Sequence, residues 1–148
     1  MTGWLVASLH LLALGLGVWG IWTRARALGK LPEPAALKEV FYADNFWGMA
    51  AILWISTGLT RTFGSDDKGA HYYLESPTFW LKMGLLLLVL ALEVWPMTTL
   101  IGWRIALARG QRPNLSPAPI FARISWVQLF MTLVMVWVAV ALRRGLGG

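Results

Sequence analysis

Four apolar runs, each close to the length of a membrane span, dominate the sequence. They cover residues 4–22, 40–60, 78–103 and 119–142. About 20 apolar residues in a helix cross the roughly 30 Å hydrocarbon core of a bilayer. The sequence therefore predicts an all-α protein, an integral membrane four-helix bundle that forms a single transmembrane domain over residues 1–148.

The composition favours lipid as the solvent of these helices. The chain is 57% hydrophobic and 14% charged, with a mean hydropathy of +0.60, whereas soluble domains carry about 25% charged residues. The net charge of +6 comes from short basic clusters between the apolar runs. Such clusters set membrane topology, so nucleic acid is not an expected partner. The chain has no cysteine, which excludes disulfides, thiolate metal sites and thioether-linked haem.

The basic residues also predict an orientation. Eight of them lie around the first and third linkers, and five lie on the opposite side. The positive-inside rule then places both termini in the periplasm of a bacterial inner membrane. The first apolar run opens almost at Met1 and ends in Thr23-Arg24-Ala25-Arg26. This is the reverse of the order in a signal peptide, so we expect a retained first helix.

Small or polar residues recur at helical spacing in every predicted span, so that each helix has one such stripe. The stripes are His10, Ala13, Gly17, Gly20 and Arg24; Asp44, Gly48, Ala51, Ile55, Gly58 and Thr62; Lys82, Leu86, Val89, Glu93 and Pro96; and Ser125, Gln128, Thr132, Met135 and Ala139. Small residues let transmembrane helices approach closely, and hydroxyl or amide side chains bond across the contact. Helix packing therefore accounts for the glycines and alanines.

The ionisable residues of these stripes fall into two layers. His10 and Lys82 are expected at a similar depth near one surface. Nearer the other surface we expect Arg24, Asp44 and Glu93, with Asn45 and Arg123 beside them. A charge inside the bilayer costs about 2.5–3.5 kcal/mol on insertion scales and usually faces the interior of a bundle. We therefore expect Glu93 to pair with an arginine, either as a structural ion pair or as part of a proton relay.

His10 is the only histidine within a predicted span. An imidazole can ligate a metal through one nitrogen while another group holds the second nitrogen. Ala13 and Gly17 follow on the same face and leave the gap that a flat macrocycle needs beside its ligand. The alternative is a hydrogen-bonded packing residue. Lys82 either extends to the membrane surface or anchors a propionate or an anionic substrate.

Several motifs carry a resemblance to known proteins. These motifs are Ser8-Leu9-His10-Leu11-Leu12, Tyr42-Ala43-Asp44-Asn45-Phe46-Trp47-Gly48, Thr57-Gly58-Leu59, Trp80-Leu81-Lys82 and Glu93-Val94-Trp95-Pro96. Together they resemble an uncharacterised family of bacterial four-span membrane proteins. The resemblance covers nearly the whole chain, and it implies the fold without implying a function.

More distantly, the chain resembles the haem-dependent protoporphyrinogen oxidases of the HemJ type. Those proteins have a histidine early in the first helix, a glycine ten residues later, an arginine six residues beyond it and a lysine that opens a later helix. The matching positions here are His10, Gly20, Arg26 and Lys82. The resemblance implies b-type haem bound through the histidine and a functional role for the lysine.

The chain departs from that family in two places. It has no histidine shortly after Arg26, and the region around Glu93 and Pro96 follows a different pattern. Membrane proteins of the CopD type share the general helix pattern, but the sequence shows no Met-rich or His-rich copper motif.

These observations predict a b-type haem-binding membrane protein with a redox role, and protoporphyrinogen oxidation is its specific form. The predicted haem b site comprises His10, Gly17, Gly20, Arg26 and Lys82, with His10 as the metal ligand and with Lys82 and Glu93 as the catalytic residues. Two alternatives stay open: a non-catalytic subunit or assembly factor of a larger membrane complex, and a small proton-coupled transporter. The expected partners are the lipid bilayer and either a second copy or a larger membrane complex.

Overall fold

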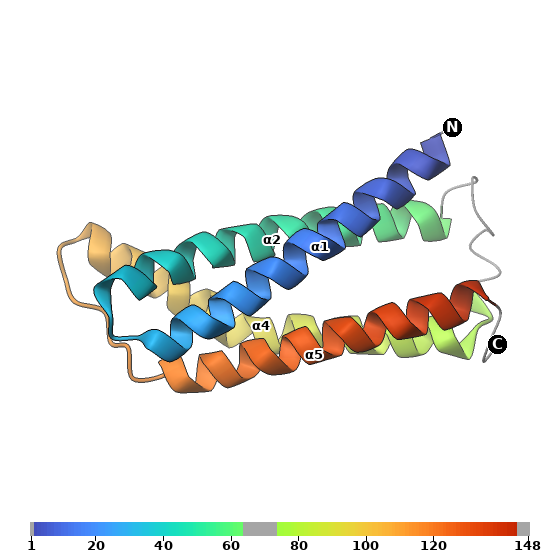
Figure 1. Cartoon of the computed structure of the whole chain (residues 1–148). Helices are drawn as coiled ribbons and strands as arrows, with labels where there is room; N and C mark the ends of the chain where they lie inside the picture. The colour runs from blue at the N-terminus through green and yellow to red at the C-terminus, as the bar shows by residue number, and fades with distance from the viewer. Residues whose placement is uncertain (1, 64–73, 145–148) are drawn as a thin grey trace.

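The computed structural model describes residues 2–63 and 74–144 of the chain. Within these two ranges it contains four long helices and no strand. The helices are α1 (Thr2–Lys30), α2 (Pro34–Phe63), α4 (Pro77–Ala108) and α5 (Ala118–Arg143), as labelled in Figure 1. The all-α prediction is confirmed for this described part, and each apolar run lies inside one helix. The helices extend beyond the runs because their polar end turns continue the same backbone hydrogen bonding.

Three of the helices are long and apolar enough to cross a membrane. These spans are Gly3–Lys30, Pro77–Ala108 and Ala118–Ala141. α2 has a similar length, but its middle turns include the polar residues Asp44 and Asn45. A fourth span in α2 therefore stays a prediction, as does the periplasmic position of the termini.

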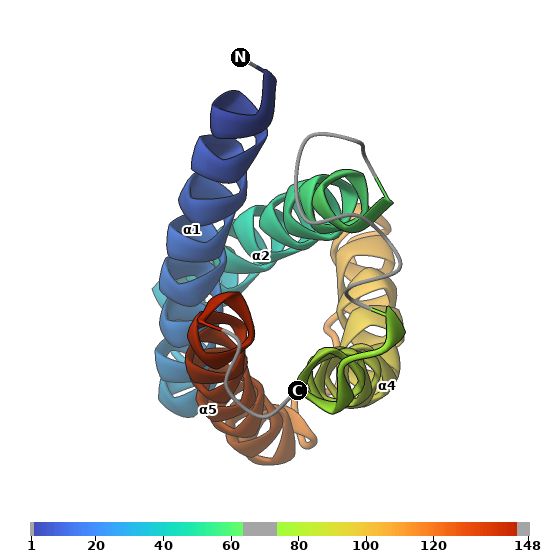
Figure 2. The same cartoon turned by 90° about the vertical axis from the view of Figure 1, so that its right-hand side faces the viewer.

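The helices run alternately in opposite directions and surround a common interior (Figures 1 and 2). Seen from one end in Figure 2, their order around this interior is α1, α2, α4 and α5. α1 packs on α2 and α5, and α4 packs on α5. The backbones of α2 and α4 are not packed against each other in this way. This side is therefore joined mainly through side chains, and we call it the α2–α4 seam.

α1 and α2 approach each other closely at Gly20. A Cβ atom added there would lie 2.9 Å from the backbone nitrogen of Trp47 and 3.2 Å from the carbonyl oxygen of Ala43. Both are backbone atoms of α2 and cannot move aside as a side chain can. The missing side chain of Gly20 thus permits the contact between the two helices.

Apolar side chains pack in two clusters along the interior. One cluster, toward the turn between α1 and α2, includes Leu28, Val40, Leu100 and Phe121. The other consists of Ile21, Trp47, Val89 and Met135 with their neighbours. On every helix, a polar residue lies in the sequence between its members of the two clusters. The polar residues therefore occupy a single layer between two apolar ones.

We expect Gly20→Ala to lower the free energy of unfolding by about 1–3 kcal/mol, the usual range for overpacking a tight contact. Gly15→Ala is the matched control, because nothing lies within 4 Å of a Cβ atom added at Gly15. The measurement is unfolding by SDS titration in mixed micelles. Equal stability of the two variants would contradict the assignment of Gly20 to the α1–α2 contact.

Candidate functional site

A fully buried arginine lies at the centre of the polar layer. Arg24 on α1 is 0% exposed. Its Nε donates to Ser125 Oγ (3.1 Å), and its Nη1 donates to Asp44 Oδ1 and Glu93 Oε2 (2.8 Å each). Its Nη2 donates to Glu93 Oε1 (2.9 Å) and Gln128 Oε1 (2.8 Å). A guanidinium has five N–H donors, so these five bonds use all of them.

The carboxylate of Glu93 is held by three side chains. Besides the two bonds from Arg24, Oε1 accepts from Trp47 Nε1 (3.2 Å) and Gln128 Nε2 (3.0 Å). Gln128 also donates to the carbonyl oxygen of Val89 (3.0 Å). Glu93 thus accepts four hydrogen bonds, three at Oε1 and one at Oε2. The predicted pairing of Glu93 with an arginine is confirmed, whereas Arg123, expected at this depth, is exposed.

A second arginine balances the charge of this layer. Arg104 Nη2 lies 3.2 Å from Asp44 Oδ2 and donates to it, and it also donates to Asn45 Oδ1 (2.9 Å) and to the carbonyl oxygen of Phe41 (3.2 Å). Asp44 thus receives one arginine on each oxygen. Two arginines face two carboxylates, so the formal charge of the group is zero.

We call this group the Arg24 cluster; its members are Arg24, Asp44, Glu93, Arg104, Ser125 and Gln128. It takes side chains from all four helices. Since it links Asp44 on α2 with Glu93 and Arg104 on α4, it joins the two helices whose backbones do not pack. Low surrounding polarity strengthens such bonds and raises the penalty for breaking one of them.

His10 lies in a second layer, 14 residues before Arg24 and thus about 21 Å away along α1. Its Nδ1 is 2.8 Å from Thr57 Oγ1. The Thr57 hydroxyl lies 2.8 Å from the carbonyl oxygen of Leu53 and donates to it. When the hydroxyl proton is donated to Leu53, the matching tautomer of His10 has its proton on Nδ1, which then donates to Thr57. Nε2 is then the ring nitrogen that carries the lone pair.

Trp54 and Gly58 complete the surroundings of the imidazole. The Trp54 ring stacks on it with centroids 5.2 Å apart and an angle of 12° between the planes. A Cβ atom added to Gly58 would lie 3.3 Å from His10 Cε1, so Gly58 allows the ring to lie close against α2. The indole Nε1 of Trp54 is buried and has no hydrogen-bond partner among the residues that the structure describes.

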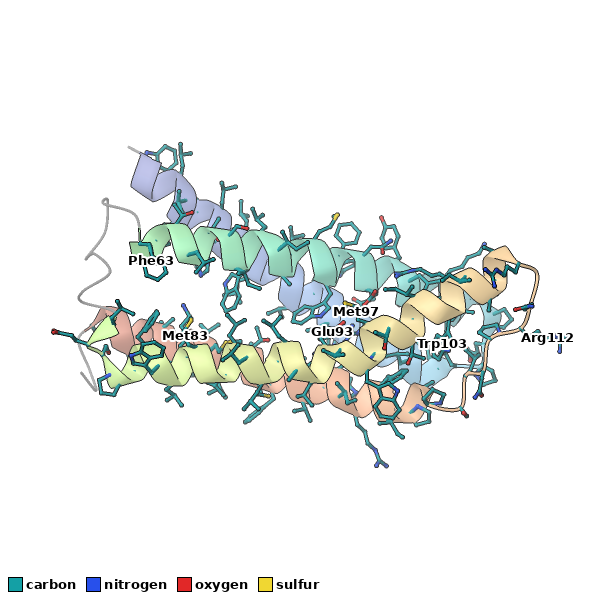
Figure 3. The ribbon with its side chains drawn as sticks, turned by 180° about the vertical axis from the view of Figure 1, so that it is seen from behind. Phe63, Met83, Glu93, Met97, Trp103 and Arg112 are labelled. Atoms are coloured by element: carbon teal, nitrogen blue, oxygen red, sulfur yellow. The ribbon has the colours of Figure 1, made fainter. Side chains whose placement is uncertain are left out.

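Lys82 joins His10 in this layer, as the sequence predicted. Its Nζ lies 5.5 Å from the centroid of the Trp54 ring. Lys82 and His10 line one cavity of about 210 Å³, whose other walls are almost entirely apolar. Figure 3 shows two of its lining residues, Phe63 on α2 and Met83 on α4, at the same end of the molecule. We call this the His10 cavity.

A second cavity, of about 280 Å³, lies between the two layers, and we call it the Glu93 cavity. It shares Trp54, Ile55 and Leu86 with the His10 cavity. Its lining residues come from all four helices, and Glu93 and Met97 on α4 are labelled in Figure 3. The two cavities therefore adjoin each other along the α2–α4 seam.

The predicted haem-site residues are only partly brought together. His10 and Lys82 line the His10 cavity, whereas Gly17 and Glu93 line the other one. Gly20 packs on the backbone of α2, as described above. The side chain of Arg26 is exposed, with its guanidinium carbon 4.9 Å from the centroid of the Trp22 ring.

A metal site built from protein ligands alone is absent from the described part of the chain. Among residues 2–63 and 74–144, no group of three or more His, Cys, Asp or Glu side chains can hold a metal ion. His71, which the sequence offers as a second histidine, lies outside the described residues. A single histidine matches a cofactor that brings its own metal ligands, as a macrocycle does.

Sequence reasoning missed Arg104, Trp47, Trp54 and Thr57 as members of these layers. Arg104 was counted only as a charge at a helix end, although it follows Glu93, Met97 and Leu100 at 4-3-4 spacing and so shares their face. Trp47 and Trp54 are seven residues apart and adjoin the polar stripe of α2. This spacing indicates that both side chains face the interior of the bundle.

Comparison with known proteins identifies the family of the chain. A family model described as a predicted membrane protein (DUF2214) matches residues 2–147. The chain belongs to this family. The predicted membership of an uncharacterised membrane-protein family is thereby confirmed, and the family description names no activity. No curated protein and no solved structure matches the chain, so the likeness to the HemJ and CopD types stays a prediction.

We expect Arg24→Met to lower the free energy of unfolding by about 3–5 kcal/mol, because it leaves buried carboxylates without their partner. Arg24→Met combined with Glu93→Met removes one charge of each sign and leaves Asp44 with Arg104, so the double variant should be more stable than the single one. Arg26→Met, at an exposed site, is the control. An Arg24→Met protein as stable as this control would contradict the central position of the Arg24 cluster.

Proposed function

We propose that all four helices cross the membrane and that the protein binds b-type haem at His10, in a redox role. The observation that carries this proposal is the imidazole of His10, which Thr57 holds through Nδ1 while Nε2 keeps its lone pair. Metal-ligating histidines are usually oriented in this way by a second group. The adjoining cavity supplies a lysine for an anionic substituent.

The length and the exposed face of α2 support its assignment as the fourth span. Thirty residues extend about 45 Å, more than the hydrocarbon core requires. Asp44, the charged residue within the apolar run 40–60, is paired inside the bundle. Met49, Ile52 and Leu59 on its outer side are apolar and exposed, as lipid contact requires. Four spans place both chain ends on one side, and the basic residues favour the periplasmic side.

The polar groups of the His10 cavity fit the requirements of haem b. Haem needs an axial ligand, partners for its propionates and room for its ring. His10 supplies the ligand, while the Lys82 ammonium and the unpaired N–H of Trp54 supply donors for a carboxylate. A buried N–H without an acceptor costs about 1–3 kcal/mol and calls for an explanation, which a bound carboxylate would give.

The available volume sets a condition on this proposal. The His10 cavity, at about 210 Å³, is smaller than the roughly 300–1,000 Å³ of ordinary ligand pockets. The adjoining Glu93 cavity and the loosely joined α2–α4 seam provide the neighbouring space. Haem would supply one-electron redox chemistry, whereas His10, Lys82 and Trp54 would bind and orient it.

The Arg24 cluster favours a structural role for the two carboxylates over proton transport. Both oxygens of Glu93 accept from Arg24, and both oxygens of Asp44 accept from arginines. A proton carrier has to release such partners in every cycle, at a high cost inside a low-dielectric interior. We therefore assign Glu93 to holding the helices in place and keep Lys82 as the candidate for contact with a substrate.

The first test is an optical spectrum of the purified protein from haem-replete cells, oxidised and then reduced. We expect a Soret band that shifts on reduction and is lost in His10→Ala, because the axial ligand is removed. His71→Ala, which changes the other histidine of the chain, should keep the band. A colourless wild-type protein would overturn the haem proposal and favour the alternative of a non-catalytic subunit.

A second test addresses the role of Thr57. Thr57→Val keeps the shape of the side chain but removes the oxygen that holds His10 Nδ1, so we expect haem affinity to fall about 10–100-fold. The midpoint potential should rise, because a less basic imidazole stabilises the oxidised iron less. Thr60→Val, at an exposed position one turn away, is the control. Unchanged affinity and potential in Thr57→Val would argue against His10 as the ligand.

A further inference from the structure

The Glu93 cavity has an opening toward the surface that lipid would cover. Ile52 on α2 and Leu90 and Met97 on α4 line the cavity and are also exposed on the outside. They lie on the two sides of the α2–α4 seam, where the backbones do not pack. A lipid-soluble molecule can therefore enter from the bilayer through side-chain movement alone, without passing through water.

The polar end of this cavity consists of hydrogen-bond acceptors. Asp44 and Glu93 are the ionisable residues in its walls. The donors beside these carboxylates are already used: all five N–H groups of Arg24 are bonded, and Trp47 Nε1 donates to Glu93. The hydroxyl of Thr132, also in the wall, donates to the carbonyl oxygen of Gln128 (2.8 Å). Trp54, which borders the His10 cavity as well, has an N–H without a partner among the described residues. A ligand that bonds to Asp44 has to bring its own donor.

Asp44 has more acceptor capacity left than Glu93, whose Oε1 already accepts three hydrogen bonds and whose Oε2 accepts one. Glu93 accepts four hydrogen bonds, whereas Asp44 accepts one from Arg24 and one from Arg104. A carboxylate has about four lone-pair sites, so two remain on Asp44. The side chain of Asp44 is 12% exposed and lines the cavity, so these sites are within reach of a bound molecule.

The charge balance selects an uncharged donor. Asp44 and Glu93 are matched by Arg24 and Arg104, so the cluster has no net charge that would attract an ammonium group. A cation would also have to leave the headgroup region and cross apolar lipid to reach the opening. A neutral hydroxyl meets neither obstacle, and its O–H donates to a carboxylate in a strong, charge-assisted bond.

We propose that the Glu93 cavity is a binding site for a neutral, lipid-soluble phenol or alcohol. The ligand's O–H donates to the carboxylate of Asp44, and its apolar body lies along the α2–α4 seam against Ala51 and Leu90. The site adjoins the His10 cavity, shares Trp54, Ile55 and Leu86 with it, and does not require bound haem.

The test compares two ligands that differ only in the donor: para-pentylphenol and its methyl ether. Binding to the protein in lipid nanodiscs is measured by native mass spectrometry, with empty nanodiscs correcting for partition into lipid. We expect the phenol to bind about tenfold or more tightly than the ether, as a hydrogen bond to a charged acceptor predicts. Equal binding of the two ligands would overturn the proposal and indicate a space that any apolar chain fills.

Two substitutions then locate the site. Ala51→Phe fills the cavity without altering the Arg24 cluster and should reduce phenol binding by tenfold or more. Ala91→Phe, at an exposed position on α4 outside the cavity, is the matched control and should bind the phenol like the wild type. Phenol binding that survives Ala51→Phe would overturn the assignment of this cavity. None of these readouts uses the Soret band, so a colourless protein leaves this test unaffected.

Discussion

The guanidinium of Arg24 is the group on which the arrangement of the helices depends. It is completely buried, and each of its five N–H groups needs an acceptor, because an unpaired charge-bearing donor in this environment is very costly. The acceptors come from α2, α4 and α5. One side chain on α1 therefore determines where the three other helices lie at this depth. The two carboxylates and Arg104 then make the layer electrically neutral.

The hydrogen bonds of this polar layer hold α2 and α4 together, although the backbones of these two helices do not pack closely. α2 and α4 are joined by Trp47, Asp44 and Arg104 at the level of the Arg24 cluster rather than by close packing of their backbones. The α2–α4 seam also contains two adjoining cavities, one that reaches Asp44 and Glu93 of the cluster and one beside His10. A fully hydrogen-bonded cluster and two largely apolar cavities thus lie next to each other in one small protein. Ligand-binding regions are commonly drawn from the less densely packed parts of a structure.

The two cavities differ in the chemistry that they offer. The His10 cavity is lined by the amine of Lys82, the imidazole of His10 and the ring of Trp54, whose indole N–H has no hydrogen-bond partner among the described residues. The Glu93 cavity offers the carboxylate oxygens of Asp44 and Glu93 as acceptors. The haem and the neutral hydroxyl compound that we propose as ligands would therefore bond to different groups. Trp54, Ile55 and Leu86 line both cavities.

The sequence by itself determined the helices, the inward stripes and the two depths at which ionisable residues gather. Hydropathy and 3.6-residue periodicity depend only on neighbours along the chain, which is why Glu93 and an arginine were expected to pair. Periodicity does not reveal which helices lie side by side or how closely their backbones approach. Only the tertiary structure decided that Arg24 is the central arginine, that Arg104 completes the charge balance, and that Trp54 lies against His10. It also decided that Gly20 serves a helix contact and that the α2–α4 side stays open, because these features arise from packing between helices.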